Sequence, residues 1–208
     1  MSESFTEYQV RLMLEKIAGG IPKHPSIIEG WINAKNKNKS ELQKTALVNA
    51  TLEELPAMAN EELAKSWCGF KSDEHGLYLE SRNVIAMMKE GANVCKDIIK
   101  IKQMKAKLVE RVFLVDRKVY LGGKKEPDGF DERPVSTWQG SALKRTDYVE
   151  NCEIAFRIKI LNDPGANKIP AKALKQVFEY GQDGGLGASR SQGYGQYQLL
   201  EFQEVEAA

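Results

Sequence analysis

The 208-residue sequence has no long apolar run and no beginning typical of a secreted protein. No stretch approaches the ~18 consecutive apolar residues that a membrane span needs. The opening, MSESFTEYQV, lacks both the basic region and the apolar core of a secretory signal. We therefore expect a protein of the cytoplasm, of a cell or of an infected host, with no membrane partner.

Cysteine and histidine are also scarce. Cys68, Cys95 and Cys152 lie far apart and without a CxxC spacing, so we expect buried thiols rather than a disulfide framework or a zinc site. The only two histidines are His24 and His75, too few for a histidine-based metal site. The nucleotide-loop spacings GxGxxG and GxxxxGK[ST] are absent as well. We expect neither a metal nor a cofactor.

Neither sign of charge dominates the chain. Thirty Lys and Arg stand against 29 Asp and Glu, a net charge of +1, so the protein is not a general polycation. The distribution is uneven, however, because residues 96–147 hold thirteen basic and eight acidic side chains. This unevenness predicts a local basic surface.

What the sequence does contain is clear periodicity. Alternating apolar residues predict strands, and apolar residues three or four positions apart predict helices. Strands are expected at 7–17, on both sides of a turn at 116–117, at 148–161 and at 197–205, and helices at 26–35, in pieces of 36–66 broken at Pro56, at 82–98 and at 169–182. Ser26 and Ser81 are the expected helix caps.

This order gives a core that reads βαββαβ. It predicts an α+β fold of the ferredoxin-like (RRM-like) kind, with an antiparallel sheet and two helices on one face. We expect a single domain over 1–208, with a helical insertion at about 25–70 and a long β-hairpin or loop excursion at about 122–147.

The stretch GGLGASRSQGYGQY, called the glycine loop below, holds five glycines within twelve positions before the last strand. Glycine loses more freedom on folding than any other residue, so this density needs a reason. The interpretation we favour is that bare backbone N–H groups, hydroxyls and an arginine approach a phosphate backbone. The alternative is a turn that packs a helix against the sheet. The candidate residues are Gly184, Gly185, Gly187, Ser189, Arg190, Ser191, Gly193, Tyr194 and Gly195.

Residues 174–202, LKQVFEYGQDGGLGASRSQGYGQYQLLEF, resemble the carboxy-terminal signature of the RAMP superfamily, the repeat-associated proteins of CRISPR effector complexes. That signature is a helix, a glycine-rich loop with a basic residue, two glycines around an aromatic residue, and a final strand. Residues 76–92, GLYLESRNVIAMMKEGA, resemble the start of the first core helix in backbone subunits of the superfamily. The whole chain is similar to compact members from phages and plasmids, which implies the cytoplasm of a bacterial cell or a phage-infected host.

The resemblance implies single-stranded RNA held along a groove, a β-hairpin thumb, and subunits stacked in a filament. The excursion GGKKEPDGFDERPVSTWQGSALKRTD lies where such a thumb would be. Basic groups that follow phosphates and aromatic rings that stack on bases, each stack contributing ~1–3 kcal/mol, suit a single-strand binder. The candidates are Lys124, Lys125, Arg133, Lys144 and Arg145 for phosphates, and Trp138, with Phe130 nearby, for bases. The alternative is a solvated loop whose cations pair with Asp128, Asp131 and Glu132.

These features together predict a non-catalytic protein that binds single-stranded RNA or DNA, RNA before DNA. We expect it to oligomerise along the strand and to contact other effector-complex subunits. Two alternatives stay open. One is a RAMP-type endoribonuclease with His24 as general base beside Lys23, or with Asp73. The other is a protein–protein adaptor that does not bind nucleic acid.

Overall fold

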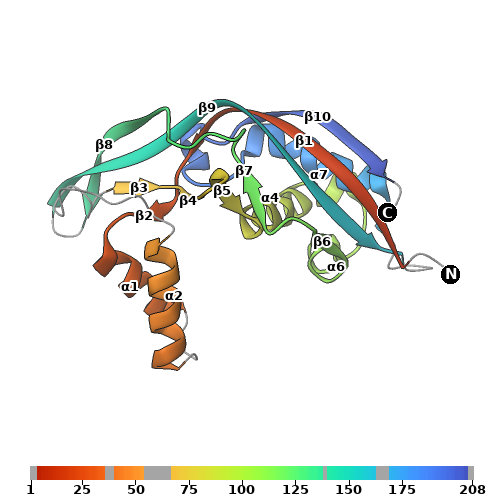
Figure 1. The fold of residues 1–208 in the computed structure, drawn as a ribbon. Coiled ribbons are helices and arrows are strands. Elements are labelled where there is room, and N and C mark those ends of the chain that lie inside the picture. Colours follow the sequence, from red (N-terminus) through yellow and green to blue (C-terminus); the bar gives the residue numbers. More distant parts are fainter. Residues whose placement is uncertain (1–3, 36–39, 54–66, 138–139, 163–168, 206–208) are drawn as a thin grey trace. The chain divides into compact units, whose positions relative to one another are not determined.

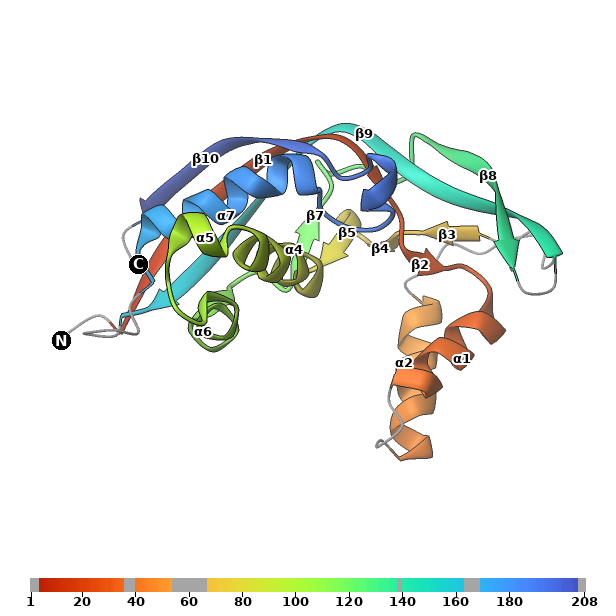
Figure 2. The same ribbon diagram turned by 180° about the vertical axis from the view of Figure 1, so that it is seen from behind.

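The computed structural model describes residues 4–35, 40–53, 67–137, 140–162 and 169–205 (Figures 1 and 2). Internal contacts divide the chain into two compact units. The first unit consists of residues 1–17, 79–122 and 150–208, and the second of residues 18–78 and 123–149. The second unit is therefore assembled from two segments that leave and re-enter the first.

The first unit carries the ferredoxin-like core. Its elements are β1 (Phe5–Ala18), the end of β5 (Gly76–Glu80), α4 (Ser81–Val94), α5 (Lys96–Ile99), α6 (Met104–Arg111), β6 (Val112–Leu114), β7 (Lys118–Tyr120), the second half of β9 (Gly140–Leu161), α7 (Ala171–Gly184), the short helix η1 (Arg190–Gln192) and β10 (Tyr197–Val205).

The main sheet of this unit has the order β10–β1–β9–β6. β10 is antiparallel to β1 and β6 is antiparallel to β9, while β1 and β9 run in opposite directions in Figure 1. Both views show α4 and α7 on one face of this sheet. With β1, α4, β6, β9, α7 and β10 in chain order, the predicted α+β fold with a βαββαβ core is confirmed.

The hydrophobic core lies between that sheet and the two helices. Alternate residues of β1 and β9 point to the same face, as the period of two requires. The buried side chains on this side are Val10, Leu12, Leu14, Ile154, Phe156 and Ile158 from the strands, and Val84, Met88, Leu174, Val177 and Phe178 from the helices. Gly91 lets α4 approach α7, because a Cβ there would lie 3.0 Å from Val177 Cγ1.

The second unit contains the predicted helical insertion and the hairpin. Its elements are β2 (Ile21–Pro22), α1 (Pro25–Lys35), α2 (Glu41–Glu53), β3 (Trp67–Gly69), β4 (Lys71–Asp73), the start of β5, β8 (Gly129–Thr137) and the first half of β9. β8 pairs with β9 in an antiparallel register, so the excursion is a β-hairpin. β3 runs parallel to β9 and joins the insertion to the base of the hairpin.

The two expected helix caps are wrong. α1 begins at Pro25, and Ile27 and Ile28 donate their N–H groups to the His24 carbonyl, so Ser26 lies inside the first turn. Ser81 is the first residue of α4, and the preceding Glu80 makes no capping hydrogen bond through its side chain. The expected break at Pro56 lies outside the described residues.

Candidate nucleic-acid interface

The glycine loop is held at its two ends by its own backbone. Leu186 donates its N–H to the Gly195 carbonyl at 2.8 Å, and Gly195 donates its N–H to the Lys16 carbonyl of β1 at 2.7 Å. Leu186 is fully buried. Tyr197, the first residue of β10, donates its hydroxyl to the Phe178 carbonyl of α7 at 2.7 Å, and burial raises the pKa of that hydroxyl. The loop is therefore anchored to β1, α7 and the core.

Two of its glycines allow the chain to approach itself. Gly195 has a φ of +81°, and a Cβ there would overlap the Leu186 carbonyl. Gly185, at φ 76° and ψ 162°, lies in a region that only glycine populates, and a Cβ there would lie 2.7 Å from the Tyr194 carbonyl. Gly193 differs, because its φ is +83° but no atom lies within 4 Å of a Cβ built on it. The packing alternative thus accounts for two glycines, and Gly193 faces open space.

The middle of the loop carries its polar side chains. Ser189 has a φ of +55° and precedes η1, which begins at Arg190. Arg190 Nη1 lies 2.6 Å from a carboxylate oxygen of Glu90 on α4. Lys16 Nζ lies 5.7 Å from the centroid of the Tyr194 ring. The remaining candidates lie as follows: Gly184 ends α7, Gly187 has a φ of +86°, and Ser191 is exposed.

The candidate cations of the hairpin do not share one face. In the antiparallel register of the hairpin, Arg133 of β8 lies opposite Lys144 of β9, and Glu132 lies opposite Arg145. Because neighbouring residues of a strand point to opposite faces, Arg133 and Lys144 lie on one face and Arg145 on the other. Lys124 lies in the turn region before β8.

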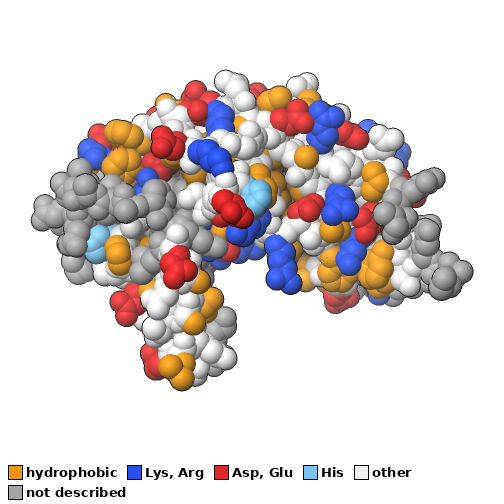
Figure 3. All heavy atoms as spheres, viewed as in Figure 1, with side chains coloured by type: hydrophobic (Ala, Val, Ile, Leu, Met, Phe, Trp, Pro, Cys, Tyr) orange, Lys and Arg blue, Asp and Glu red, His pale blue; other side chains and the backbone are white. Residues whose placement is uncertain are grey.

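Three of the five candidate cations are held by other groups of the second unit. Lys124 forms an ion pair with Asp128, and Lys125 Nζ donates to the Glu74 carbonyl. Arg145 forms an ion pair with Glu132 across the hairpin. On the face of the molecule in Figure 3, acidic and basic side chains are interspersed rather than separated by sign. The pairing expected of a solvated loop is therefore present for Lys124 and Arg145.

Arg145 also lies beside a pair of aromatic rings that contact each other. Its Cζ lies 5.3 Å from the centroid of Trp67 and 5.5 Å from that of Phe130, and the two ring centroids are 5.0 Å apart. Phe130 remains 47% exposed, so one ring of this pair faces solvent. Trp138, the expected stacking residue, lies outside the described residues.

Arg133 and Lys144 are the exception among these cations. Within the part of the chain that the structure describes, neither side chain forms an ion pair or a hydrogen bond. Both are half-buried, next to the Cys68 thiol. Burial raises the pKa of that thiol, while the charges of Lys144 and Arg133 act to lower it. This face of the hairpin thus presents two cations that no described residue neutralises.

A buried ion pair anchors the base of the hairpin, and sequence reasoning missed it. Lys23 Nζ lies 2.6 Å from Asp147 Oδ2, and their side chains are only 8% and 4% exposed. Trp67 Nε1 donates to Asp147 Oδ1 at 2.5 Å, and Lys23 Nζ lies 4.6 Å from the Trp67 ring centroid. Gly69 leaves room for both partners, since a Cβ there would overlap the Lys23 side chain. Nothing in the local pattern around these residues distinguishes them from solvated charges.

On the sheet face of the first unit that the helices do not cover, the charged side chains at the centre are bound to one another. Arg11 of β1 contacts Glu153 of β9 at 2.7 Å and Glu201 of β10 at 3.1 Å. The hydrogen bond from Arg11 holds the pKa of the Glu153 carboxyl below its ordinary value. RRM proteins stack bases on aromatic side chains at the centre of this face. Here paired charges occupy that place, so the sheet face is unsuited to this mode of binding.

His24 has a local structural role. It is 8% exposed, and its Nδ1 lies 2.7 Å from Ser26 Oγ at the start of α1. Lys23, its expected assistant, is bound to Asp147. Among the described residues no group of three or more His, Cys, Asp or Glu side chains is placed to hold a metal ion.

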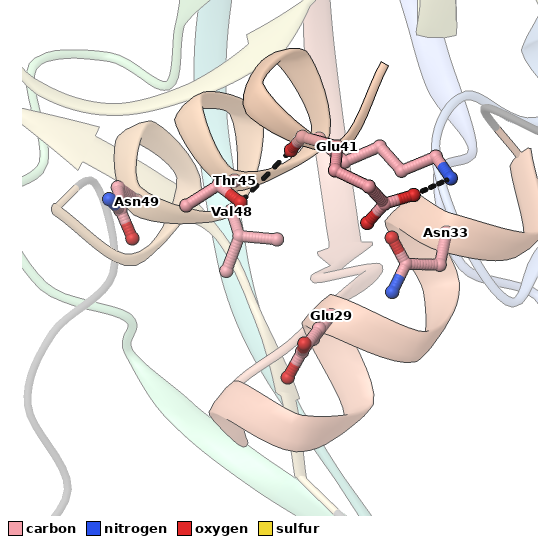
Figure 4. A pocket seen from close by; sticks show the side chains of 7 residues that line it. Glu29, Asn33, Glu41, Thr45, Val48 and Asn49 are labelled. Carbon is pink, nitrogen blue, oxygen red and sulfur yellow. Dashed lines mark hydrogen bonds and ion pairs between the residues drawn. The ribbon is translucent and has the colours of Figure 1, made fainter. Parts of the chain in front are cut away.

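A cleft of about 250 Å³ lies between α1 and α2 (Figure 4). Its lining includes the carboxylates Glu29 and Glu41, and its lysine, Lys44, is bound to Glu41 at 2.7 Å. Thr45 Oγ1 donates to the Glu41 carbonyl at 3.0 Å. Because its cation is already neutralised, this cleft is unsuited to phosphate groups. No helix in the described ranges is long and apolar enough to span a membrane.

Comparison with known proteins adds a likeness of fold. No family model matches the sequence, and no curated protein matches it. A chain in the solved structure titled "Cryo-EM structure of the Type III-B Cmr-beta bound to cognate target RNA" is similar, with a TM-score of 0.56 and 11% sequence identity. The match covers 99% of this chain and 62% of that chain, so this chain spans less than two thirds of its neighbour's length. At this identity, the two chains share a fold.

Proposed function

We propose that this chain is a RAMP-type protein that binds single-stranded nucleic acid, RNA in preference to DNA, and does not cleave it. The observation that carries the proposal is a pair of cations, Arg133 and Lys144, on one face of a β-hairpin, for which the described residues supply no counter-charge. Phosphates are the natural counter-charges for such a pair, and Arg offers them a bidentate donor set.

Two further features support this function. The fold is similar to that of a chain from an effector complex whose structure title names a bound target RNA. The middle of the glycine loop, with Ser189, Arg190 and Ser191, is a second contact for phosphates, contributed by the first unit. Arg190 would exchange Glu90 for a phosphate.

The test is binding of a labelled strand of about 30 nucleotides, as RNA and as DNA, at several salt concentrations. Each phosphate contact to a single strand contributes about 0.7 to the slope of log affinity against log salt. The Arg133→Ala/Lys144→Ala variant should bind at least about tenfold more weakly at low salt and lose about 1.4 of that slope. The control, Lys124→Ala/Lys125→Ala, removes two cations that already have partners and should bind almost as well as the parent.

Equal losses in both double variants would refute the assignment of the site to the Arg133 face. If neither strand binds at low salt, the protein is an adaptor rather than a nucleic-acid binder. Sizing the protein with and without the strand tests oligomerisation, because a filament-forming subunit grows into multimers only when the strand is present.

A further inference from the structure

The first unit has a second basic surface, at α5 and α6, that the proposed function does not use. The segment 94–110 contains five lysines, two acidic residues, and neither arginine nor an aromatic residue. We call the lysine surface the exposed side chains Lys96, Lys100, Lys102 and Lys105 together with Val94, Ile98 and Val109. Apolar and basic side chains lie side by side at the position of α6 in Figure 3.

The lysines of this surface have no counter-charge. Among the described residues none of Lys96, Lys100, Lys102 and Lys105 forms an ion pair, a hydrogen bond through its side chain or a ring contact. Several other cations of the first unit form ion pairs: Arg11 with Glu153, Lys16 with Glu150, Arg157 with Glu7, Lys175 with Glu179 and Arg190 with Glu90. Lys89, Arg117 and Lys172 form none among the described residues, but they are far apart in the sequence, whereas the four lysines of this surface fall within residues 96–105. The positive charge of the lysine surface is therefore available to a partner.

The backbone here adopts a conformation that costs free energy. Lys100, after α5, and Gln103, before α6, have φ values of +54° and +58°. A left-handed conformation costs a residue with a side chain roughly 1–2 kcal/mol, and glycine adopts it freely. Both residues lie at helix ends, so these φ values belong to the short connection between α5 and α6.

Three exposed aliphatic side chains belong to the same segment as these lysines. Ile98 is 69% exposed, Val94 is 51% exposed and Val109 is 46% exposed, whereas Met104 and Leu108 of α6 are buried in the unit. Exposed aliphatic groups gain free energy when a partner covers them. A phosphate backbone does not cover them, and there is no aromatic ring in the segment to stack a base. A membrane-binding face would carry bulky anchors such as Trp, Phe and Leu, which these positions lack.

We propose that the lysine surface docks an acidic amphipathic helix of a partner protein. The partner's carboxylates would lie against Lys100, Lys102 and Lys105, and its apolar stripe against Ile98 and its aliphatic neighbours. Such helix-on-surface recognition uses apolar anchors three or four residues apart. The proposal is independent of nucleic-acid binding, since it involves none of the residues assigned to that function.

The probe is a synthetic peptide of about 18 residues with leucines at helical spacing and glutamates elsewhere. Its control is a scrambled peptide of the same composition without the apolar stripe. Binding is followed by fluorescence anisotropy with the full chain. The parent should bind the first peptide in a salt-sensitive manner and the scrambled one at least about fivefold more weakly.

Two matched pairs of variants locate the site. Lys100→Glu/Lys102→Glu should weaken peptide binding by about tenfold or more, whereas Lys172→Glu/Lys175→Glu on α7, with the same change of charge, should leave it within about twofold. Ile98→Ser should weaken binding severalfold, and Leu200→Ser, which alters an exposed apolar residue of β10, should not.

The proposal is overturned if the parent does not bind the peptide, or if both charge-reversed variants lose binding equally. It is also overturned if Lys100→Glu/Lys102→Glu still binds the peptide but no longer binds a labelled RNA strand, because the lysine surface would then be a nucleic-acid surface. If that variant loses only its binding to phosphatidylserine vesicles, the proposal is overturned as well, because the lysine surface would then be a membrane surface.

Discussion

The close approach of the chain to itself at Gly195 gives a quantitative prediction about the glycine loop. Gly195→Ala must accommodate a φ of +81° and a Cβ that overlaps the Leu186 carbonyl, while Gly193→Ala must accommodate only a φ of +83°. The left-handed conformation costs about 1–2 kcal/mol in both variants. Displacing the buried Leu186 segment adds about 1–3 kcal/mol at position 195 alone. We expect a loss of about 2–5 kcal/mol for Gly195→Ala and about 1–2 kcal/mol for Gly193→Ala.

The assay is urea unfolding followed by two signals. All three tryptophans fall in segments of the second unit, so far-ultraviolet circular dichroism follows both units while tryptophan fluorescence follows the second. The loop belongs to the first unit, so the difference between the variants should be seen in the dichroism. Equal free-energy losses for the two variants would refute the reasoning, because the cost would then come from φ alone.

Two further predictions concern the second unit. Asp147→Asn should cost about 3–5 kcal/mol of unfolding free energy measured by tryptophan fluorescence, because it leaves the buried Lys23 ammonium without its counter-charge. Glu41→Gln, which removes a carboxylate that is 85% exposed from its pair with Lys44, should cost less than about 1 kcal/mol, and equal costs would contradict this account. Alkylation of Cys68 near neutral pH should be slower than alkylation of an unfolded cysteine, because the raised pKa of the thiol reduces its thiolate fraction. A bound RNA strand should slow the alkylation of Cys68 further, because it would cover Arg133 and Lys144. Peptide mapping separates Cys68 from the buried Cys95 and Cys152, and an unchanged Cys68 rate at saturating RNA would place the strand elsewhere.

The core elements could be predicted from the sequence because each carries its own periodicity. The face Tyr8, Val10, Leu12 and Leu14 and the face Cys152, Ile154, Phe156 and Ile158 are both buried as alternation requires. The helix caps could not be predicted in the same way. Ser26 and Ser81 are favourable cap residues by type, but each helix begins before or at them. Composition alone does not say which residue adopts the extended conformation that precedes a helix.

The candidate site also contains features that could be predicted from the sequence and features that could not. The hairpin was expected from the resemblance to a family with a thumb, because residues 122–147 themselves form a polar stretch rich in turn formers in which no strand is predicted. Which of its cations stay unpaired was not predictable, since that depends on register. Glu132 lies opposite Arg145, and a shift of one residue would exchange the two faces. Lys23 and Asp147 are more than a hundred positions apart in the sequence. Two tertiary contacts bring them together: the Gly19 N–H donates to the Asp147 carbonyl at 2.8 Å, and β3 pairs in parallel with β9.

That pairing also decides which face of the hairpin a ligand would use. Trp67 covers the Arg145 face, where Arg145 is already bound to the Glu132 carboxylate, and the Trp67 ring itself contacts Phe130 and donates to Asp147. A phosphate would therefore meet a neutralised cation on this face. On the opposite face Arg133 and Lys144 lie side by side, and within the described ranges no carboxylate is bound to either. The insertion that supplies Trp67 and Lys23 thus gives the hairpin one neutral, packed side and one cationic side. A strand that bound both faces equally would be inconsistent with this asymmetry. Arg145→Ala should therefore lower stability more than affinity, and Arg133→Ala should lower affinity more than stability.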